Sequence, residues 1–132
     1  MSPEIKHKHV IVRAVVKNPL VDPEYCKAWL AQLVEKLNMK ILIGPIAAYC
    51  DNPGNKGVTG AVIIETSHMA IHIWDEDTPS VVQFDVYTCG EMDPEIIFEH
   101  LEIMEPVSLH YRYLDRLSNL TEVSNGEKSW TV

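Results

Sequence analysis

The sequence of 132 residues has no long apolar run and little positive charge. No window approaches the roughly 20 consecutive apolar residues of a membrane-spanning helix, and the N-terminal stretch has no apolar segment long enough for a signal peptide. We therefore expect a cytoplasmic protein without a membrane segment. Eleven Lys and Arg stand against nineteen Asp and Glu, a formal net charge of −8. Because this balance repels phosphate backbones, we do not expect nucleic-acid binding.

Cysteine is also scarce, and the three that occur, Cys26, Cys50 and Cys89, are not closely spaced. Disulfide frameworks and zinc knuckles need paired or closely spaced cysteines, so we expect three reduced thiols. Hydrophobic residues make up 46% of the chain and charged residues 23%, which is typical of a protein that buries a core. A chain of this length fits a single domain over residues 1–132.

Apolar and β-branched patterns predict strands and helices in the order βαβ followed by ββαβ. The expected strands cover residues 7–17, 40–50, 80–89 and 107–115, with two further pieces inside 58–74 that break near Ser67. Because proline lacks an N–H, the Gly44-Pro45 step argues for an edge position or a bulge in the strand over 40–50.

Two Asp-Pro-Glu segments predict helix starts, at Asp22 and Asp93, since Asp caps a helix, Pro suits its first position and Glu faces the positive end of its dipole. The first helix is expected to reach about Met39. These elements predict an α+β two-layer sandwich, with two helices on one face of a mainly antiparallel sheet. The other face is expected to need a partner subunit, and residues 117–132 are expected to form a loose tail.

Reactive side chains concentrate between Gly57 and Cys89. His68, His72 and Glu76 are four apart, as metal ligands on one helix face would be. On a strand, however, four residues span about 13 Å at about 3.3 Å each, too far for two ligands of one zinc with bonds of about 2 Å. A serine hydrolase is also disfavoured, because the Gly-x-Ser-x-Gly elbow is missing. We therefore expect neither a metal site nor this hydrolase chemistry.

Several separated motifs stand in a recognisable order. They are GVTG at 57–60, TSHMAIHIWDE at 66–76, DVYTCG at 85–90, DP at 93–94 and FEHL at 98–101. With these motifs the chain resembles the prokaryotic S-adenosylmethionine decarboxylases, roughly from residue 9 to 112 in element order and specifically between 57 and 101. The resemblance implies a pyruvoyl-dependent decarboxylase made as a proenzyme that cleaves itself between Thr66 and Ser67.

The resemblance also implies roles for single residues. The hydroxyl of Ser67 attacks the carbonyl of Thr66, the resulting ester eliminates, and the new chain begins with a pyruvoyl group. That ketone forms a Schiff base with the substrate amine and accepts electrons as carbon dioxide leaves, so no metal or external cofactor is expected. His72 acts on the α-proton of the ester. Thr59 helps the ester to form, and Cys89 reprotonates the decarboxylated carbon.

Three further positions bear on the substrate. Glu76 matches the acid that holds the ribose hydroxyls. Tyr49 is the aromatic residue nearest to the loop 51–56, which lacks the phenylalanine that stacks on adenine in the family. Arg13 stands where an acidic residue is frequent and could bind a carboxylate through two hydrogen bonds. Two small-molecule substrates stay open, namely S-adenosylmethionine, for spermidine synthesis, and a basic amino acid, ornithine or arginine.

Strand alternation places His72 and Glu76 on one face and Ser67 on the other, unless the chain bends near Ser67. The resemblance requires that bend and implies a homodimer that completes two active sites. Thr59 and Thr66 stand where the family usually has serine and glutamate. A folded relative that is never cleaved and acts as a binding or regulatory protein therefore stays open as well.

Overall fold

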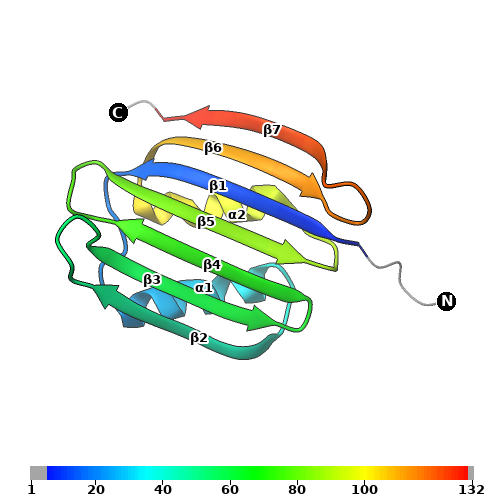
Figure 1. Ribbon diagram of the computed structural model, residues 1–132, viewed down its shortest axis with the longest axis horizontal. Coiled ribbons are helices and arrows are strands. Elements are labelled where there is room, and N and C mark those ends of the chain that lie inside the picture. Colours follow the sequence, from blue (N-terminus) through cyan, green and yellow to red (C-terminus); the bar gives the residue numbers. More distant parts are fainter. Residues whose placement is uncertain (1–5, 131–132) are drawn as a thin grey trace.

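Seven strands form one antiparallel sheet in the computed structural model, which describes residues 6–130 (Figure 1). The strands are β1 Lys8–Val16, β2 Ile41–Cys50, β3 Gly57–Ile64, β4 Ser67–Trp74, β5 Ser80–Thr88, β6 Pro106–Asp115 and β7 Thr121–Ser129. The helices are α1 Pro23–Lys36 and α2 Pro94–Leu101, followed by the short 3-10 helix η1 Glu102–Met104. Across the sheet the strand order is β2-β3-β4-β5-β1-β6-β7. The predicted α+β class is confirmed.

Both helices begin where the Asp-Pro-Glu segments predict. The Asp22 carboxylate accepts the backbone N–H of Glu24 at 2.9 Å, and Asp93 accepts that of Glu95 at 3.0 Å, so each aspartate satisfies an N–H that has no partner within its helix. Helix α1 ends at Lys36 rather than near Met39. Its end is set by Asn38, whose φ of 57° is left-handed and cannot continue the helix.

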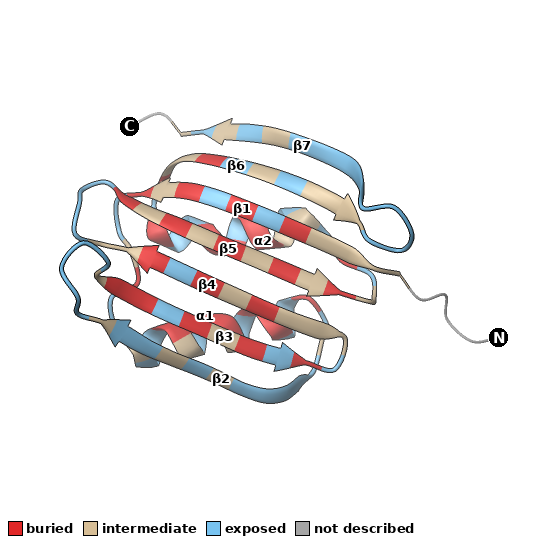
Figure 2. Cartoon of the chain, viewed as in Figure 1, coloured by how far each residue is buried: buried red, intermediate tan, exposed pale blue. Residues whose placement is uncertain are grey.

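The hydrophobic core lies between the sheet and the two helices. Alternate residues of the central strands face the helices, and these positions are fully buried, as the banding along β1, β4 and β5 shows (Figure 2). On β5 the inward residues are Val82, Phe84 and Val86, as the alternation predicts. Trp29 of α1 packs edge-on against Phe84 with ring centres 5.2 Å apart.

The opposite face of the sheet, called here the open face, is covered by no helix in the part of the chain that the structure describes. Its central positions include exposed side chains such as Ile11 and Arg13 of β1, Thr59 of β3 and His72 of β4. Side chains that carry chemistry therefore lie on a broad surface where a second molecule could cover them.

The expectation of a loose tail over residues 117–132 is wrong for most of that range. Residues Thr121–Ser129 form β7, which pairs with β6 from Ser108 opposite Ser129 to Asp115 opposite Thr121. The sequence of β7 is polar and predicts no strand. The strand forms because the edge of β6 supplies backbone partners. Trp130 packs against the core, and residues 131–132 lie outside the described range.

The expectation for the strand over residues 40–50 is confirmed. Strand β2 lies at the edge of the sheet, and its register against β3 shifts between Ile41 and Ile43 and again between Ile43 and Ile46. Gly44 adopts a φ of +97° at this point, a conformation that glycine takes without steric cost.

Candidate active site

The predicted cleavage point lies in the tight hairpin between β3 and β4. Glu65 and Thr66 form the turn, and Ile64 pairs with Ser67 across it. The chain thus reverses just before Ser67, but this reversal does not place Ser67 on the face of His72, as the predicted bend would. Ser67 has a φ of 152°, which residues with a side chain rarely adopt, and such strain costs of the order of 1–3 kcal/mol. The backbone is therefore strained at the residue expected to act as the nucleophile.

The carbonyl group that Ser67 would attack is held by a hydrogen bond. The backbone N–H of Cys89 donates to the Thr66 oxygen at 2.8 Å. A donor in this position stabilises negative charge that develops on the oxygen during attack. The side chain of Thr66 differs, because its hydroxyl oxygen is buried and has no hydrogen-bond partner among the described residues. A buried unpaired hydroxyl costs about 1–3 kcal/mol.

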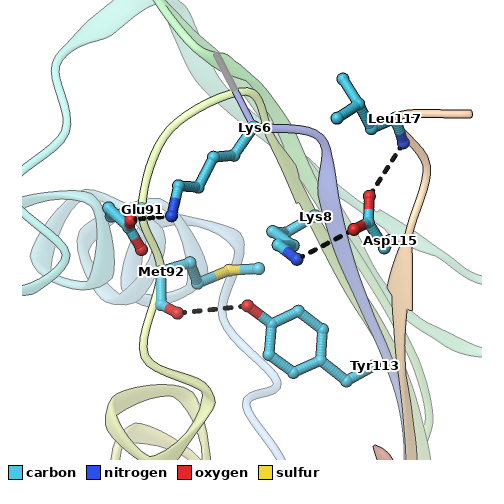
Figure 3. Close-up of polar contacts among 7 residues, drawn as sticks. All are labelled: Lys6, Lys8, Glu91, Met92, Tyr113, Asp115 and Leu117. Atoms are coloured by element: carbon cyan, nitrogen blue, oxygen red, sulfur yellow. Dashed lines mark hydrogen bonds and ion pairs between the residues drawn. The ribbon is translucent and has the colours of Figure 1, made fainter. Parts of the chain in front are cut away.

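The segment that follows Cys89 is tied to the N-terminal strand region and to β6 (Figure 3). The Lys6 N–H donates to the Cys89 carbonyl at 2.9 Å, and its ammonium pairs with Glu91. The Tyr113 hydroxyl donates to the Met92 carbonyl at 3.4 Å. These contacts fix the strand end that carries the Cys89 N–H.

An ion pair next to this segment secures the end of β6 (Figure 3). Asp115 accepts the Leu117 N–H at 2.9 Å and the Lys8 ammonium at 3.2 Å. These two hydrogen bonds, the Leu117 one first, lower the pKa of Asp115. Lys8 thereby joins β1 to β6 close to the tethered segment.

Thr59 and His72 meet on the open face. They are cross-strand partners on β3 and β4, and the Thr59 hydroxyl lies 3.2 Å from Nδ1 of the imidazole. Both side chains are exposed. Sequence reasoning assigned both to the same processing reaction, and the fold brings these two together.

The fold does not bring this pair to the Ser67 of the same chain. Ser67 and His72 stand five positions apart on β4, roughly 16 Å on an extended strand at about 3.3 Å per residue. Ser67 also has the strand parity of buried Met69, opposite to that of His72. The predicted site residues therefore form two groups, one at the hairpin with Cys89 and one on the open face with Thr59.

A cavity of about 480 Å³ lies on the open face beside the second group. Its lining includes Arg13, Lys56, Trp74 and Glu76. Oε1 of Glu76 accepts the backbone N–H groups of Gly54 at 2.6 Å and of Lys56 at 3.2 Å. Glu76 therefore anchors the loop before β3 with one carboxylate oxygen.

Two aromatic residues near this cavity differ in their placement. Tyr49, a predicted contact, is not part of the cavity lining. Its hydroxyl donates to Asp75 at 2.9 Å, and this hydrogen bond is the main cause of a raised Tyr49 pKa. Trp74 does line the cavity and is fixed by a 2.8 Å hydrogen bond from its indole N–H to Asn55. Sequence reasoning missed Trp74, although its position two residues before Glu76 was a usable signal.

Within residues 6–130 no group of three or more His, Cys, Asp or Glu side chains is placed to hold a metal ion. Over the same residues no helix is long and apolar enough to cross a membrane.

Comparison with known proteins adds a family. A sequence model described as S-adenosylmethionine decarboxylase matches residues 8–117. An S-adenosylmethionine decarboxylase proenzyme from Pyrococcus furiosus is 28% identical over 127 residues, which cover 94% of this chain and 86% of the relative. One from Archaeoglobus fulgidus is 31% identical over 112 residues, covering 83% and 96%. An arginine decarboxylase proenzyme from Aeropyrum pernix is 30% identical over 119 residues, covering 88% and 86%.

The fold agrees with that of a solved structure, the adenosylmethionine decarboxylase from Aquifex aeolicus. The two align with a TM-score of 0.67 at 22% identity, covering 94% of this chain and 100% of the other. The sequence match runs from the start of β1 to just beyond β6 and includes both groups of site residues. The chain belongs to the S-adenosylmethionine decarboxylase family.

Proposed function

We propose that this chain is the proenzyme of a pyruvoyl-dependent decarboxylase and that it cleaves itself between Thr66 and Ser67. The observation that carries the proposal is the geometry of the hairpin. Ser67 is strained, with a φ of 152°, and the preceding carbonyl accepts the Cys89 N–H at 2.8 Å. Attack on the carbonyl relieves the strain and places charge on an oxygen that already has a donor.

The proposed cleavage has three steps. The Ser67 oxygen adds to the Thr66 carbonyl carbon and the peptide C–N bond breaks, so the serine nitrogen becomes a free amine and the two residues are joined by an ester. Removal of the Ser67 α-proton then breaks the bond between its β-carbon and the ester oxygen, and Thr66 leaves as a carboxylate. Water finally replaces the nitrogen, which departs as ammonia, and the new chain begins with a pyruvoyl group.

A pyruvoyl group would accept the electron pair of the carbon–carbon bond that breaks when the substrate loses carbon dioxide. The chain's own residues surround that chemistry. His72 is the proposed base for the Ser67 α-proton, and its Nδ1 lies 3.2 Å from the Thr59 hydroxyl. The half-buried thiol of Cys89, beside the junction, is the proposed donor of the proton that replaces carbon dioxide.

A homodimer would unite the two groups of residues. Within one chain His72 is roughly 16 Å along β4 from Ser67 at about 3.3 Å per residue, whereas the exposed open face leaves His72 accessible to a second copy. We infer that the hairpin end of each subunit meets the open face of the other, so that the Thr59 and His72 of one subunit serve the Ser67 of the other. An isologous pair of this kind forms two equal sites.

We infer that S-adenosylmethionine is the substrate of the open-face cavity. Its volume of about 480 Å³ is within the usual range of ligand sites, roughly 300–1,000 Å³. The Trp74 indole offers a flat surface for adenine and for the sulfonium charge, and Glu76 has a second carboxylate oxygen for ribose hydroxyls. The formal net charge of −8 favours the approach of a cationic substrate.

A basic amino acid is the second candidate. One similar protein carries the name arginine decarboxylase proenzyme, and Arg13 lines the same cavity as Glu76. An arginine can bind a carboxylate in a bidentate manner, while the Glu76 carboxylate would attract the basic end of such a substrate.

Release of labelled carbon dioxide from S-adenosylmethionine, arginine and ornithine tests the proposal. We expect purified, cleaved protein to release it fastest from S-adenosylmethionine. Trp74→Ala should raise KM for this substrate at least tenfold, and Trp130→Ala, a tryptophan outside the cavity, is the matched control. A faster reaction with arginine or ornithine would replace the substrate. No release from any of the three would leave the non-catalytic relative as the better description.

A further inference from the structure

A second cavity, of about 460 Å³, lies on the helix side of the sheet, next to the cleavage junction. It is bounded by the end of α1, the start of α2 and the last residues of β5. Its lining includes Lys36, Thr66, Thr88, Gly90, Glu91, Asp93 and Ile96. Thr66 is half-buried in its wall. The cavity shares no lining residue with the open-face cavity, so the substrate site does not account for it.

The lining contains Lys36, an exposed lysine at the end of α1 whose ammonium contacts an imidazole. The Lys36 ammonium lies 3.1 Å from Nδ1 of His100. Nε2 of that imidazole donates to the Trp29 carbonyl at 2.8 Å, so Nδ1 carries the lone pair and accepts from the lysine. Within the described part of the chain, no carboxylate lies within ion-pair distance of Lys36. A neutral acceptor therefore holds a positive charge at this cavity.

The acidic residues of the lining are engaged elsewhere. Glu91 pairs with Lys6, and the Asp93 carboxylate caps α2 by accepting the Glu95 N–H at 3.0 Å. Neither carboxylate compensates Lys36, so the lysine is available to a further anion.

Thr66 is the residue of the lining that changes on cleavage. In the uncut chain its carbonyl accepts the Cys89 N–H at 2.8 Å, and its hydroxyl oxygen is buried without a partner among the described residues. Cleavage before Ser67 would turn that carbonyl into a carboxylate and remove the link that fixes the threonine. An anion would thus form in the wall of a cavity that contains an uncompensated cation.

We propose that this cavity receives the new C-terminal carboxylate of Thr66, with Lys36 as its counter-ion and the freed threonine hydroxyl forming a hydrogen bond there. This inference rests on the proposed self-cleavage. It makes Lys36 a positioning residue that stabilises the cut form of the protein. A small free carboxylic acid has the same chemistry as the Thr66 carboxylate and is the other ligand that the cavity could take.

A thermodynamic cycle tests the pairing. Lys36→Met and Lys36→Arg are made in the cleavable chain and in Ser67→Ala, in which no carboxylate forms, and the melting temperature of each protein is measured. Loss of the His100 contact affects both backgrounds. We expect Lys36→Met to lower the melting temperature of the cleaved protein by about 3–5 °C more than that of Ser67→Ala. Lys36→Arg, which keeps the positive charge, should show no such extra loss in the cleaved protein.

Two results would overturn the inference. Equal losses in both backgrounds would show that Lys36 acts only through His100. Acetate that stabilises cleaved protein and Ser67→Ala equally, and only while Lys36 is present, would make the cavity a site for free carboxylates. Intact mass separates this failure from that of the proposed function. If the parent chain stays uncut, both the self-cleavage and this use of the cavity fail, whereas a cut chain with equal losses refutes the cavity assignment alone.

Discussion

Cys89 contributes two different groups to the proposed chemistry, its backbone N–H and its thiol. Its backbone N–H contacts the Thr66 carbonyl at 2.8 Å, a contact that any residue except proline would keep. Its thiol is half-buried and unpaired by disulfide. The N–H is assigned to cleavage and the thiol to proton return during decarboxylation, so one substitution should separate the two reactions.

Cys89→Ala should cleave as the parent chain does, because the N–H remains, while its decarboxylation kcat should fall by roughly 10²–10⁴ through loss of the proton donor. Gel analysis measures the first and carbon dioxide release the second. Cys50→Ala, which removes another half-buried thiol, serves as the control. Loss of cleavage in Cys89→Ala would show that the thiol, rather than the backbone, is needed at the junction.

Residue chemistry was predictable only in part. The motif around Ser67, His72 and Cys89 indicated the reaction, because those residue types and their order are specific. Whether the residues meet within one chain depends on strand alternation and on the hairpin. The alternation alone already indicated that His72 and Ser67 lie on opposite faces of the strand. The role proposed for Lys36 was not predictable, since Lys36 and Thr66 come to line the same cavity only in the folded chain.

Helices α1 and α2 are joined by a reciprocal pair of hydrogen bonds. The Trp29 indole donates to the His100 carbonyl at 3.1 Å, the His100 imidazole donates to the Trp29 carbonyl at 2.8 Å, and the two rings stack with centres 4.5 Å apart. Burial is the main cause of a lowered His100 pKa, because it disfavours the charged imidazolium. The contact between the two helices therefore depends on a neutral histidine.

The stability of this contact should depend on pH. In the unfolded chain His100 has an ordinary pKa of about 6.5, and in the folded chain its pKa is lower. Unfolding therefore takes up a proton below about pH 6.5, so the stabilisation is complete above that pH and is lost as the pH falls through the folded pKa.

Melting temperatures between pH 5 and 8 check this, in Ser67→Ala so that cleavage does not intervene. His100→Gln should show a weaker fall of melting temperature below pH 6.5 than its parent. His110→Gln, which alters an exposed histidine of β6, should not. Identical pH profiles for His100→Gln and its parent would contradict the assignment.

Element boundaries were predictable where local chemistry sets them. Asp22 and Asp93 gave both helix starts, because an N-cap is a contact within a few residues. Strand β7 was not predictable, since Thr121–Ser129 is polar and the strand rests on backbone pairing with the preceding β6 rather than on an apolar pattern of its own. Asn38, whose φ of 57° ends α1, gave a weaker signal than a glycine would.

At the scale of the whole molecule, the sheet has one face packed on helices and one open face that carries Thr59, His72 and the open-face cavity. The proposed dimer, in which the hairpin end of one copy meets the open face of the other, would explain why Thr59 and His72 lie far from the Ser67 of their own chain. The same pairing would bury exposed apolar side chains such as Ile11, which is 40% exposed, and apolar burial favours association.

Co-expression of differently tagged Ser67→Ala and His72→Ala chains tests whether the site is shared. Each variant alone should stay uncut. In a mixed dimer, the His72 of the Ser67→Ala chain can serve the intact Ser67 of the other chain, so the His72→Ala chains should be cleaved. Replacing the first partner with the double variant Ser67→Ala/His72→Ala removes that histidine and should abolish the rescue. His72→Ala chains that stay uncut in the mixture would place the histidine within its own chain.

The intact mass of the purified chain, beside that of Ser67→Ala, tests self-cleavage most directly. The parent should give two fragments, residues 1–66 and 67–132, the second with a carbonyl group instead of an amine at its start, and Ser67→Ala should give one uncut species. Ser108→Ala, far from the junction on β6, should be cut as the parent is. A single uncut species from the parent, or cleavage that persists in Ser67→Ala, would contradict the assignment of Ser67 as the nucleophile.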